Sequence, residues 1–277
     1  IREGALLLPE AAQVTLFLGL LIGFGVKMPI FPLHGWLPLA HVEAPSPVSI
    51  LLSGILLKMG SYGLIRAVDT LPAAALALQG WLMALALVSI VYGGILAWRQ
   101  SDLKAMVAYS SVSHMGLVAM GFATLNREGM IGAGVQMFSH GVMTALFFAV
   151  VGMIYDQAHT RDIPRLAGFR LFMPVVAVAF IVGGLVSMGM PGFSGFIAEF
   201  PIFMGVWATH PWIAIVAAIS IVLTASYIIR IITKVFFGQL PEEFESRAFQ
   251  RRMRERHRIE LKMVPKNWFN GIRVSAH

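Results

Sequence analysis

The chain has 277 residues, of which 57% are hydrophobic and only 13% are charged, and its formal net charge at pH 7 is +7. Soluble domains carry about 25% charged residues. Apolar runs of roughly 20 residues recur along the chain, so the composition predicts an all-α polytopic membrane protein and excludes an ordinary soluble domain. Cysteine is absent from the sequence, which excludes disulfide, haem-thiolate, iron–sulfur and zinc-thiolate chemistry in this chain. We therefore expect neither a redox cofactor nor a metal site in it.

Seven membrane spans are expected, followed by a polar, basic tail. The spans cover approximately residues 11–26, 46–67, 72–98, 102–124, 128–155, 171–208 and 212–237, and the tail covers residues 238–277. The sixth span is interrupted at residues 190–195 and resumes through Glu199 to Ala208. A helix broken within a membrane is an unusual feature, and this chain has two candidates for it.

The first candidate break follows Lys27, which ends the first span. Four prolines and glycines then interrupt the helical pattern between residues 29 and 38, because proline lacks a backbone donor and glycine tolerates many conformations. Irregular backbone at membrane depth is tolerated only inside protein or beside water. We therefore expect this segment to line a cavity; a plain surface loop is the alternative.

The second candidate break resembles the first. Both contain a Met-Pro pair beside an ionisable residue, Lys27 at the first break and Glu199 after the second. Paired broken helices in corresponding positions indicate inverted repeats and mark a transport path.

Three further ionisable residues lie deep in their spans. Lys58, His114 and His140 each lie 12 positions after the start of a span, which corresponds to about 18 Å of helix. Half of the hydrocarbon core is about 15 Å, so all three lie near its midplane. With Lys27 and Glu199 they form a row of buried ionisable groups on different helices, which predicts a charge or proton relay.

Each of these residues also has a simpler explanation. Lys27 and Lys58 could extend along apolar surface to an interface. His140 could be a hydrogen-bonded packing residue, and His114 could bond the serines beside it. Glu199 in the bilayer interior is the hardest to explain in this way. The arginine cluster at residues 247–258 is typical of a solvated or lipid-facing helix rather than of a nucleic-acid site.

The lysines and arginines of the short loops set the expected orientation. One side carries Arg99, Lys104, Arg161, Arg165, Arg170 and the basic tail, and the other carries Arg2, Arg66 and Arg127. The first side is therefore expected to face the cytoplasm, or the matrix or stroma in an organelle.

Five runs in fixed order carry a specific family resemblance. They are KMPIFPLHGWLPLAH, APSPVSILLSGILLKMGSYGLIR, SDLKAMVAYSSVSHMG, QMFSHG and MPGFSGFIAEF. Together they resemble the antiporter-like proton-pumping subunits of complex I, NADH:quinone oxidoreductase, over about residues 11–238. Subunit M, or chain 4, is the most similar member, because Glu199 stands where subunits L and N and the multi-subunit cation/proton antiporters usually have lysine.

The resemblance implies a role for each buried ionisable residue. Lys27 matches the central proton-switching lysine, Lys58 the connecting lysine, His140 and His114 the intervening histidines, and Glu199 the terminal acidic residue. Proton movement would be coupled to quinone reduction in partner subunits, which would hold NADH or ferredoxin, FMN, iron–sulfur clusters and quinone. The implied partners are L-like and N-like membrane-arm subunits and membrane lipid, in a bacterial plasma membrane or in an organellar inner or thylakoid membrane.

Three departures from the family pattern qualify this assignment. Leu39 replaces the usual aspartate, no glutamate precedes Lys27 at the expected distance, and the last helix of the family is replaced by the basic tail. With Ile1 rather than Met first, the chain resembles helices seven to thirteen of a fourteen-helix subunit, truncated at both ends.

The expected division of the chain follows from this comparison. Residues 1–67 would end the first inverted repeat, residues 68–238 would form the second, and residues 239–277 would form the tail. Two alternatives remain open. One is an ion-exchange subunit of a cation/proton antiporter or membrane-bound hydrogenase, and the other is a truncated structural subunit that does not conduct.

Overall fold

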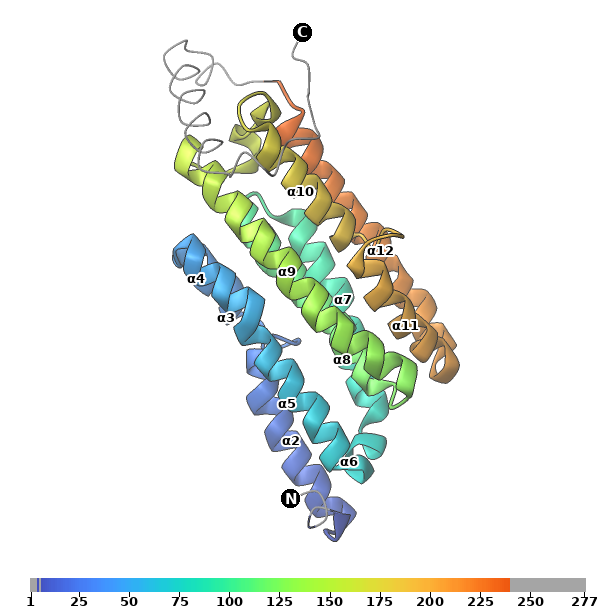
Figure 1. Ribbon diagram of the computed structural model, residues 1–277. Helices are drawn as coiled ribbons and strands as arrows, with labels where there is room; N and C mark the ends of the chain where they lie inside the picture. The colour runs from blue at the N-terminus through green and yellow to red at the C-terminus, as the bar shows by residue number, and fades with distance from the viewer. Residues whose placement is uncertain (1–3, 5, 240–277) are drawn as a thin grey trace, which may run out of the picture.

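The computed structural model describes residue 4 and residues 6–239, which form a bundle of helices (Figure 1). The α-helices in this part of the chain are α2 (Glu10–Lys27), α3 (Trp36–Glu43), α4 (Ser46–Leu51), α5 (Leu57–Thr70), α6 (Pro72–Ala77), α7 (Gln79–Arg99), α8 (Leu103–Ala123), α9 (Arg127–Ala158), α10 (Pro174–Ser187), α11 (Ser194–Thr209) and α12 (Pro211–Ile231). Two π-helical segments, η1 (Leu52–Leu56) and η4 (Ile232–Phe236), and two 3-10 turns, η2 (Ile163–Arg165) and η3 (Phe169–Leu171), complete them.

Six helical stretches of the described chain are long and apolar enough to cross a membrane. They are α2, the continuous α4–α5 stretch, α7, α8, α9 and α12 with η4. The remaining predicted span is the α10–α11 pair, whose halves of 14 and 16 residues are each too short to cross alone. The all-α, multi-pass membrane architecture expected from the sequence is therefore confirmed.

Helix α8 is the centre of the bundle. In its most apolar stretch 94% of the residues are buried, against 22% for α2 and 33% for α12, and α7, α9 and α11 pack around it. Asp102 caps its N-terminus by accepting hydrogen bonds from the backbone N–H groups of Lys104 and Ala105, at 2.7 and 2.9 Å. A polar residue on α8 is thus shielded from lipid by neighbouring helices.

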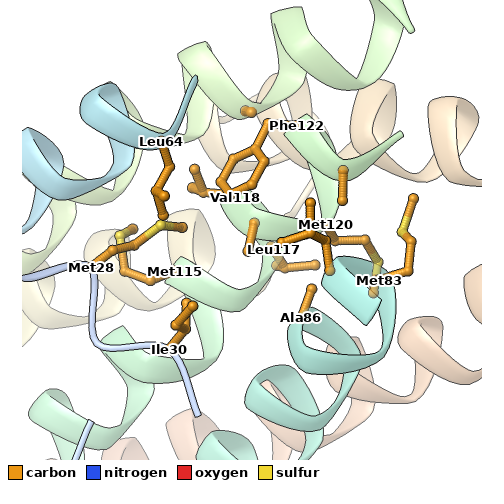
Figure 2. Close-up of a cluster of buried hydrophobic side chains, with 14 of the residues drawn as sticks. Met28, Ile30, Leu64, Met83, Ala86, Met115, Leu117, Val118, Met120 and Phe122 are labelled. Atoms are coloured by element: carbon orange, nitrogen blue, oxygen red, sulfur yellow. The ribbon is translucent and has the colours of Figure 1, made fainter. Parts of the chain in front are cut away.

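Two apolar clusters hold the helices together. The first lies where the α2–α3 break meets α5, α7 and α8 (Figure 2), and its members include Met28, Ile30, Leu64, Met83, Met115 and Phe122. The second lies toward the basic end and includes Phe147, Phe180 and Phe236, whose rings pack at 4.8 and 5.2 Å between centroids. The helices that contribute side chains to these two clusters also carry the buried ionisable residues.

The structure contains both helix interruptions, at slightly different positions from those predicted. The first covers residues 28–35, because α3 already begins at Trp36; the prediction that it reached Pro38 was wrong, since proline is tolerated in a first helical turn, where no backbone donor is needed. The second covers residues 188–193 rather than 190–195. Gly189 and Gly192 take positive φ angles of 63° and 95° there, and α11 starts at Ser194.

The loops on the predicted basic side meet at one end of the bundle. The guanidinium of Arg161 lies 3.3 Å from the carboxylate of Asp102, and Arg230 donates hydrogen bonds to the carbonyl oxygens of Trp98 and Gln100. The predicted basic tail lies outside the described residues from position 240 onward.

Candidate functional site

Lys58 is positioned by a π-helical segment that the sequence did not reveal. The segment η1, Leu52–Leu56, interrupts the helix just before Lys58, and π-turns inside α-helices occur frequently at functional sites. The Lys58 ammonium donates to the carbonyl oxygen of Ser53 at 2.6 Å. It also lies 2.6 Å from Nδ1 of His140 on α9. The side chain therefore crosses to the neighbouring helix instead of extending to a membrane interface.

His140, His114 and Glu199 continue this row through the interior. The imidazole rings of His140 and His114 lie 5.4 Å apart between centroids. Nδ1 of His114 is 3.7 Å from Oε1 of Glu199, and the same oxygen accepts a hydrogen bond of 3.4 Å from Gln136. Both histidines and Glu199 are buried. Four ionisable side chains from α5, α9, α8 and α11 thus form one row.

Two nitrogens in this row have no hydrogen-bond partner within the described part of the chain. They are Nε2 of His140 and Nδ1 of His114. An unsatisfied buried polar atom costs about 1–3 kcal/mol, so such atoms call for a functional explanation or an ordered water. The 3.7 Å between His114 and Glu199 also exceeds a direct hydrogen bond, and a single water or a small ring movement would bridge it. The pair of His114 and Glu199 is therefore an ion pair only when the imidazole is protonated.

Glu199 is positioned by the second helix interruption. It lies in the second turn of α11, directly after the break, and its Oε2 packs against the backbone of Gly189. A Cβ atom at position 189 would lie 2.6 Å from Oε2, and the φ angle of +63° there is one that L side chains rarely adopt. The broken helix therefore provides space for the carboxylate in an otherwise packed bundle.

Lys27 is the one predicted relay residue that does not join this row. It is the last residue of α2 and is exposed on the surface of the described chain. Its Cβ packs closely against Gly60, on the helix that carries Lys58. A Cβ atom added to Gly60 would lie only 2.9 Å from the Cβ of Lys27. Among the described residues, the Lys27 side chain makes no hydrogen bond or ion pair with the other four groups.

Sequence reasoning did not anticipate the burial of two basic residues: His41 was not singled out, and Lys104 was placed in a loop although it lies in the first turn of α8. His41 is fully buried on α3, its ring stacks on Phe148 at 4.4 Å, and neither ring nitrogen has a partner among the described residues. Lys104 is also buried and donates to the carbonyl oxygen of Ala44. The position of His41 directly after the proline-broken segment was the available signal.

Two surface hollows reach the buried lysines of the bundle. One, of about 490 Å³, opens at the basic end beside Lys104, Glu43, Asp156 and Arg161. The other, of about 680 Å³, is an apolar groove between the α4–α5 stretch and α9 that reaches Lys58. Within residues 4 and 6–239, no three His, Asp or Glu side chains converge in a way that could hold a metal ion.

Fold and site together define a class: multi-pass helical membrane proteins with interrupted helices and a buried row of ionisable residues. Residues 5–224 match the family of NADH:quinone oxidoreductase/Mrp antiporter transmembrane proteins, and the chain belongs to this family. The family predicted from the five sequence runs is thereby confirmed.

Individual relatives agree with this assignment. The chain is 42% identical over 246 residues to NAD(P)H-quinone oxidoreductase chain 4-3 of Nostoc sp., covering 86% of this chain and 44% of the relative. It is 40% identical over 237 residues to NADH-quinone oxidoreductase subunit M of Rhodobacter capsulatus, covering 85% and 46%. The fold matches a chain of respiratory complex I from Thermus thermophilus with bound NADH, with a TM-score of 0.81, 30% identity and coverage of 95% and 57%. The chain spans about half the length of the curated relatives it matches.

Proposed function

We propose that this chain is the proton-conducting membrane region of an M-type, or chain 4, subunit of a NADH:quinone oxidoreductase. The observation that carries the proposal is the buried row of Lys58, His140, His114 and Glu199, which links four helices inside the bundle. The names of the relatives at 40–42% identity support the same assignment. Ionisable residues inside a membrane are costly and mark ion or proton paths.

In the proposed relay, protons pass from Lys58 by way of His140 and His114 to Glu199. Lysine and histidine can release a proton where arginine cannot. The direct contact between Lys58 and His140, at 2.6 Å, makes this the first transfer step. Because the groups lie close together in a low-dielectric interior, a proton that moves along the row changes the proton affinity of the next group.

Lys27 is proposed to supply the charge that starts each transfer. Its Cβ lies against Gly60 on the helix that carries Lys58, so a change in its charge or position would act on Lys58 through that helix. An ammonium exposed toward lipid is costly. We therefore propose that a further membrane segment with a carboxylate covers Lys27 in the assembled complex.

The redox chemistry is assigned to partner subunits. NADH or ferredoxin, FMN, iron–sulfur clusters and quinone would be held there, and L-like and N-like membrane subunits would flank this chain in the membrane. The relatives named above are bacterial and cyanobacterial proteins, which favours a bacterial plasma membrane or a thylakoid membrane as the location.

The relay is tested by the substitution His140→Gln in the full-length subunit within its purified complex. Glutamine retains an oxygen that can accept a hydrogen bond from Lys58, but it cannot hold the transferred proton. We expect proton pumping by vesicles that contain the complex to fall about a hundredfold or more, given the usual contribution of a positioned acid–base group. His159→Asn, at an exposed αL position after α9, is the control and should change nothing. Unchanged pumping in His140→Gln would contradict the relay.

A second prediction concerns the space that the broken helix provides for Glu199. Gly189→Ala places a methyl group 2.6 Å from Oε2 of Glu199 and should displace the carboxylate from His114. Gly192→Ala is the matched control, because it also has a positive φ angle but meets nothing within 4 Å. Both substitutions place a side chain at a positive φ angle, which L residues rarely adopt, so both carry backbone strain. We expect a loss of pumping in Gly189→Ala alone; equal losses in both would assign the effect to backbone strain.

A further inference from the structure

Gln136 on α9 is a buried glutamine that uses only one end of its side-chain amide. The residue is 2% exposed. Its Nε2 group donates a hydrogen bond of 3.4 Å to Oε1 of Glu199 on α11, whereas its own Oε1 has no hydrogen-bond partner among the described residues. A buried acceptor without a partner is destabilising, so this oxygen calls for a functional explanation or an ordered water.

The two carboxyl oxygens of Glu199 have different surroundings. Oε2 packs against Gly189, where an added Cβ atom would lie 2.6 Å away. Oε1 faces Nδ1 of His114 on α8 at 3.7 Å and also accepts the hydrogen bond from Gln136. A proton that arrives from His114 therefore reaches the same oxygen to which the amide of Gln136 donates.

Protonation of Glu199 reverses the kind of hydrogen bond that this oxygen makes. A carboxylate only accepts, whereas a protonated carboxyl group has an O–H that donates. If the Nε2–H group of Gln136 still pointed at Glu199, the new O–H would have no acceptor there. A glutamine amide has a donor at one end and an acceptor of similar size at the other, and the torsion that exchanges them is soft. A half-turn would bring the unpartnered Oε1 of Gln136 to Glu199.

A second buried glutamine shows what is particular about Gln136. Gln13 on α2 is 4% exposed and donates from Nε2 to the backbone carbonyl oxygen of Leu8 at 3.1 Å. Its Oε1 likewise has no partner in the described part of the chain. A backbone carbonyl can only accept, so a turn of the Gln13 amide would break its bond. The partner of Gln136, by contrast, changes from acceptor to donor when it takes up a proton.

We propose that Gln136 is a positioning residue that keeps Oε1 of Glu199 facing His114 in both protonation states by turning its side-chain amide. The inference rests on the proposed relay and adds a residue to its terminal step. The N–H bond at Nδ1 of His114 breaks and an O–H bond forms on Glu199, directly or through one water, and the amide turns from donor to acceptor. When the proton leaves Glu199, the amide turns back and donates to the carboxylate again.

The test is Gln136→Met in the full-length subunit within its purified complex, in vesicles that report proton pumping. Methionine has nearly the same length but offers Glu199 neither a donor nor an acceptor. Losing one hydrogen bond changes a ratio of states about three- to tenfold, so we expect pumping to fall by a similar factor. Gln13→Met removes an equally buried amide from α2 and is the matched control, which should pump normally.

The pH profile of pumping separates positioning from packing. Of the helices packed against α11, α8 contributes His114, α9 contributes His140, α12 buries Tyr227, and α10 carries no titratable side chain; these groups remain in place in Gln136→Met. A hydrogen bond to a carboxylate is stronger than one to a neutral carboxyl group, so loss of the amide favours protonated Glu199, which cannot accept the next proton. The acid side of the profile should therefore move to higher pH by about half a unit to one unit, the same three- to tenfold factor.

Gln136→Glu keeps the length of the side chain and decides the question if Gln136→Met fails to assemble. As a neutral acid the introduced side chain can donate and accept as the amide does, but once ionised it can no longer donate. We expect near-normal pumping at low pH and a loss as the pH rises. An unchanged profile in an assembled variant, or a loss of complex alone in both, would overturn this inference. The relay itself is judged separately, by whether Lys58→Met stops pumping.

Discussion

Lys58→Met should stop proton pumping by the complex that contains this chain. Methionine has a similar length and is apolar, so it fits the site between η1 and α9 without leaving a cavity. It removes the ammonium that contacts both the Ser53 carbonyl oxygen and His140, and with it the first proton donor of the proposed row. We expect pumping to fall by at least about a hundredfold if Lys58 is an obligatory proton-transfer group, measured in vesicles with quinone as electron acceptor.

A companion substitution separates the loss of charge from the loss of proton exchange. Lys58→Arg keeps a positive charge but cannot release a proton at working pH. We expect it to assemble normally and still to pump poorly. Lys234→Met is the control, because Lys234 is an exposed lysine on η4, away from the relay. Normal pumping in both Lys58 variants would support the alternative of a structural subunit that does not conduct.

The spans, the two breaks and the depth of the ionisable residues were predictable from sequence because each depends on simple geometry. A run of about 20 apolar residues is the length that a bilayer requires. The Met-Pro pairs at residues 28–29 and 190–191 lie in the two breaks, where proline removes a backbone donor. Counting 12 residues from a span end placed Lys58, His114 and His140 at similar depth, and the structure brings these three together.

The direction in which each side chain points was not predictable in the same way. Each residue turns a helix by about 100°, so the π-helical segment at Leu52–Leu56 changes the direction in which Lys58 points. The sequence LSGIL contains no proline or other clear signal for such a segment. His41 was missed for a related reason, because its ring stacks on Phe148 of a distant helix and no local pattern indicates that contact.

Gly195→Ala should prevent assembly of a stable subunit rather than affect proton transfer. Gly195 lies in the first turn of α11, where the returning helix passes the end of α10. A Cβ atom there would overlap the carbonyl oxygen of Val186 and lie 3.0 Å from its carbonyl carbon. Backbone atoms cannot move aside as a flexible side chain can. We therefore expect Gly195→Ala to lower the stability of the folded subunit by more than the value typical of overpacking, about 1–3 kcal/mol. The measurement is the amount of the subunit recovered in the purified complex.

Gly80→Ala provides the comparison, because a Cβ atom at position 80 meets nothing within 4 Å and alanine favours helix over glycine by about 1 kcal/mol. Recovery of Gly80→Ala should equal that of the unsubstituted protein.

Normal recovery of Gly195→Ala would mean that the end of α10 can shift without loss of stability. The broken helix would then be a loose connection, and the close fit of Glu199 against Gly189 could not be what holds the carboxylate beside His114. Strong loss of Gly195→Ala, with Gly189→Ala assembled but not pumping, would show that the same break both stabilises the bundle and positions the terminal acid of the relay.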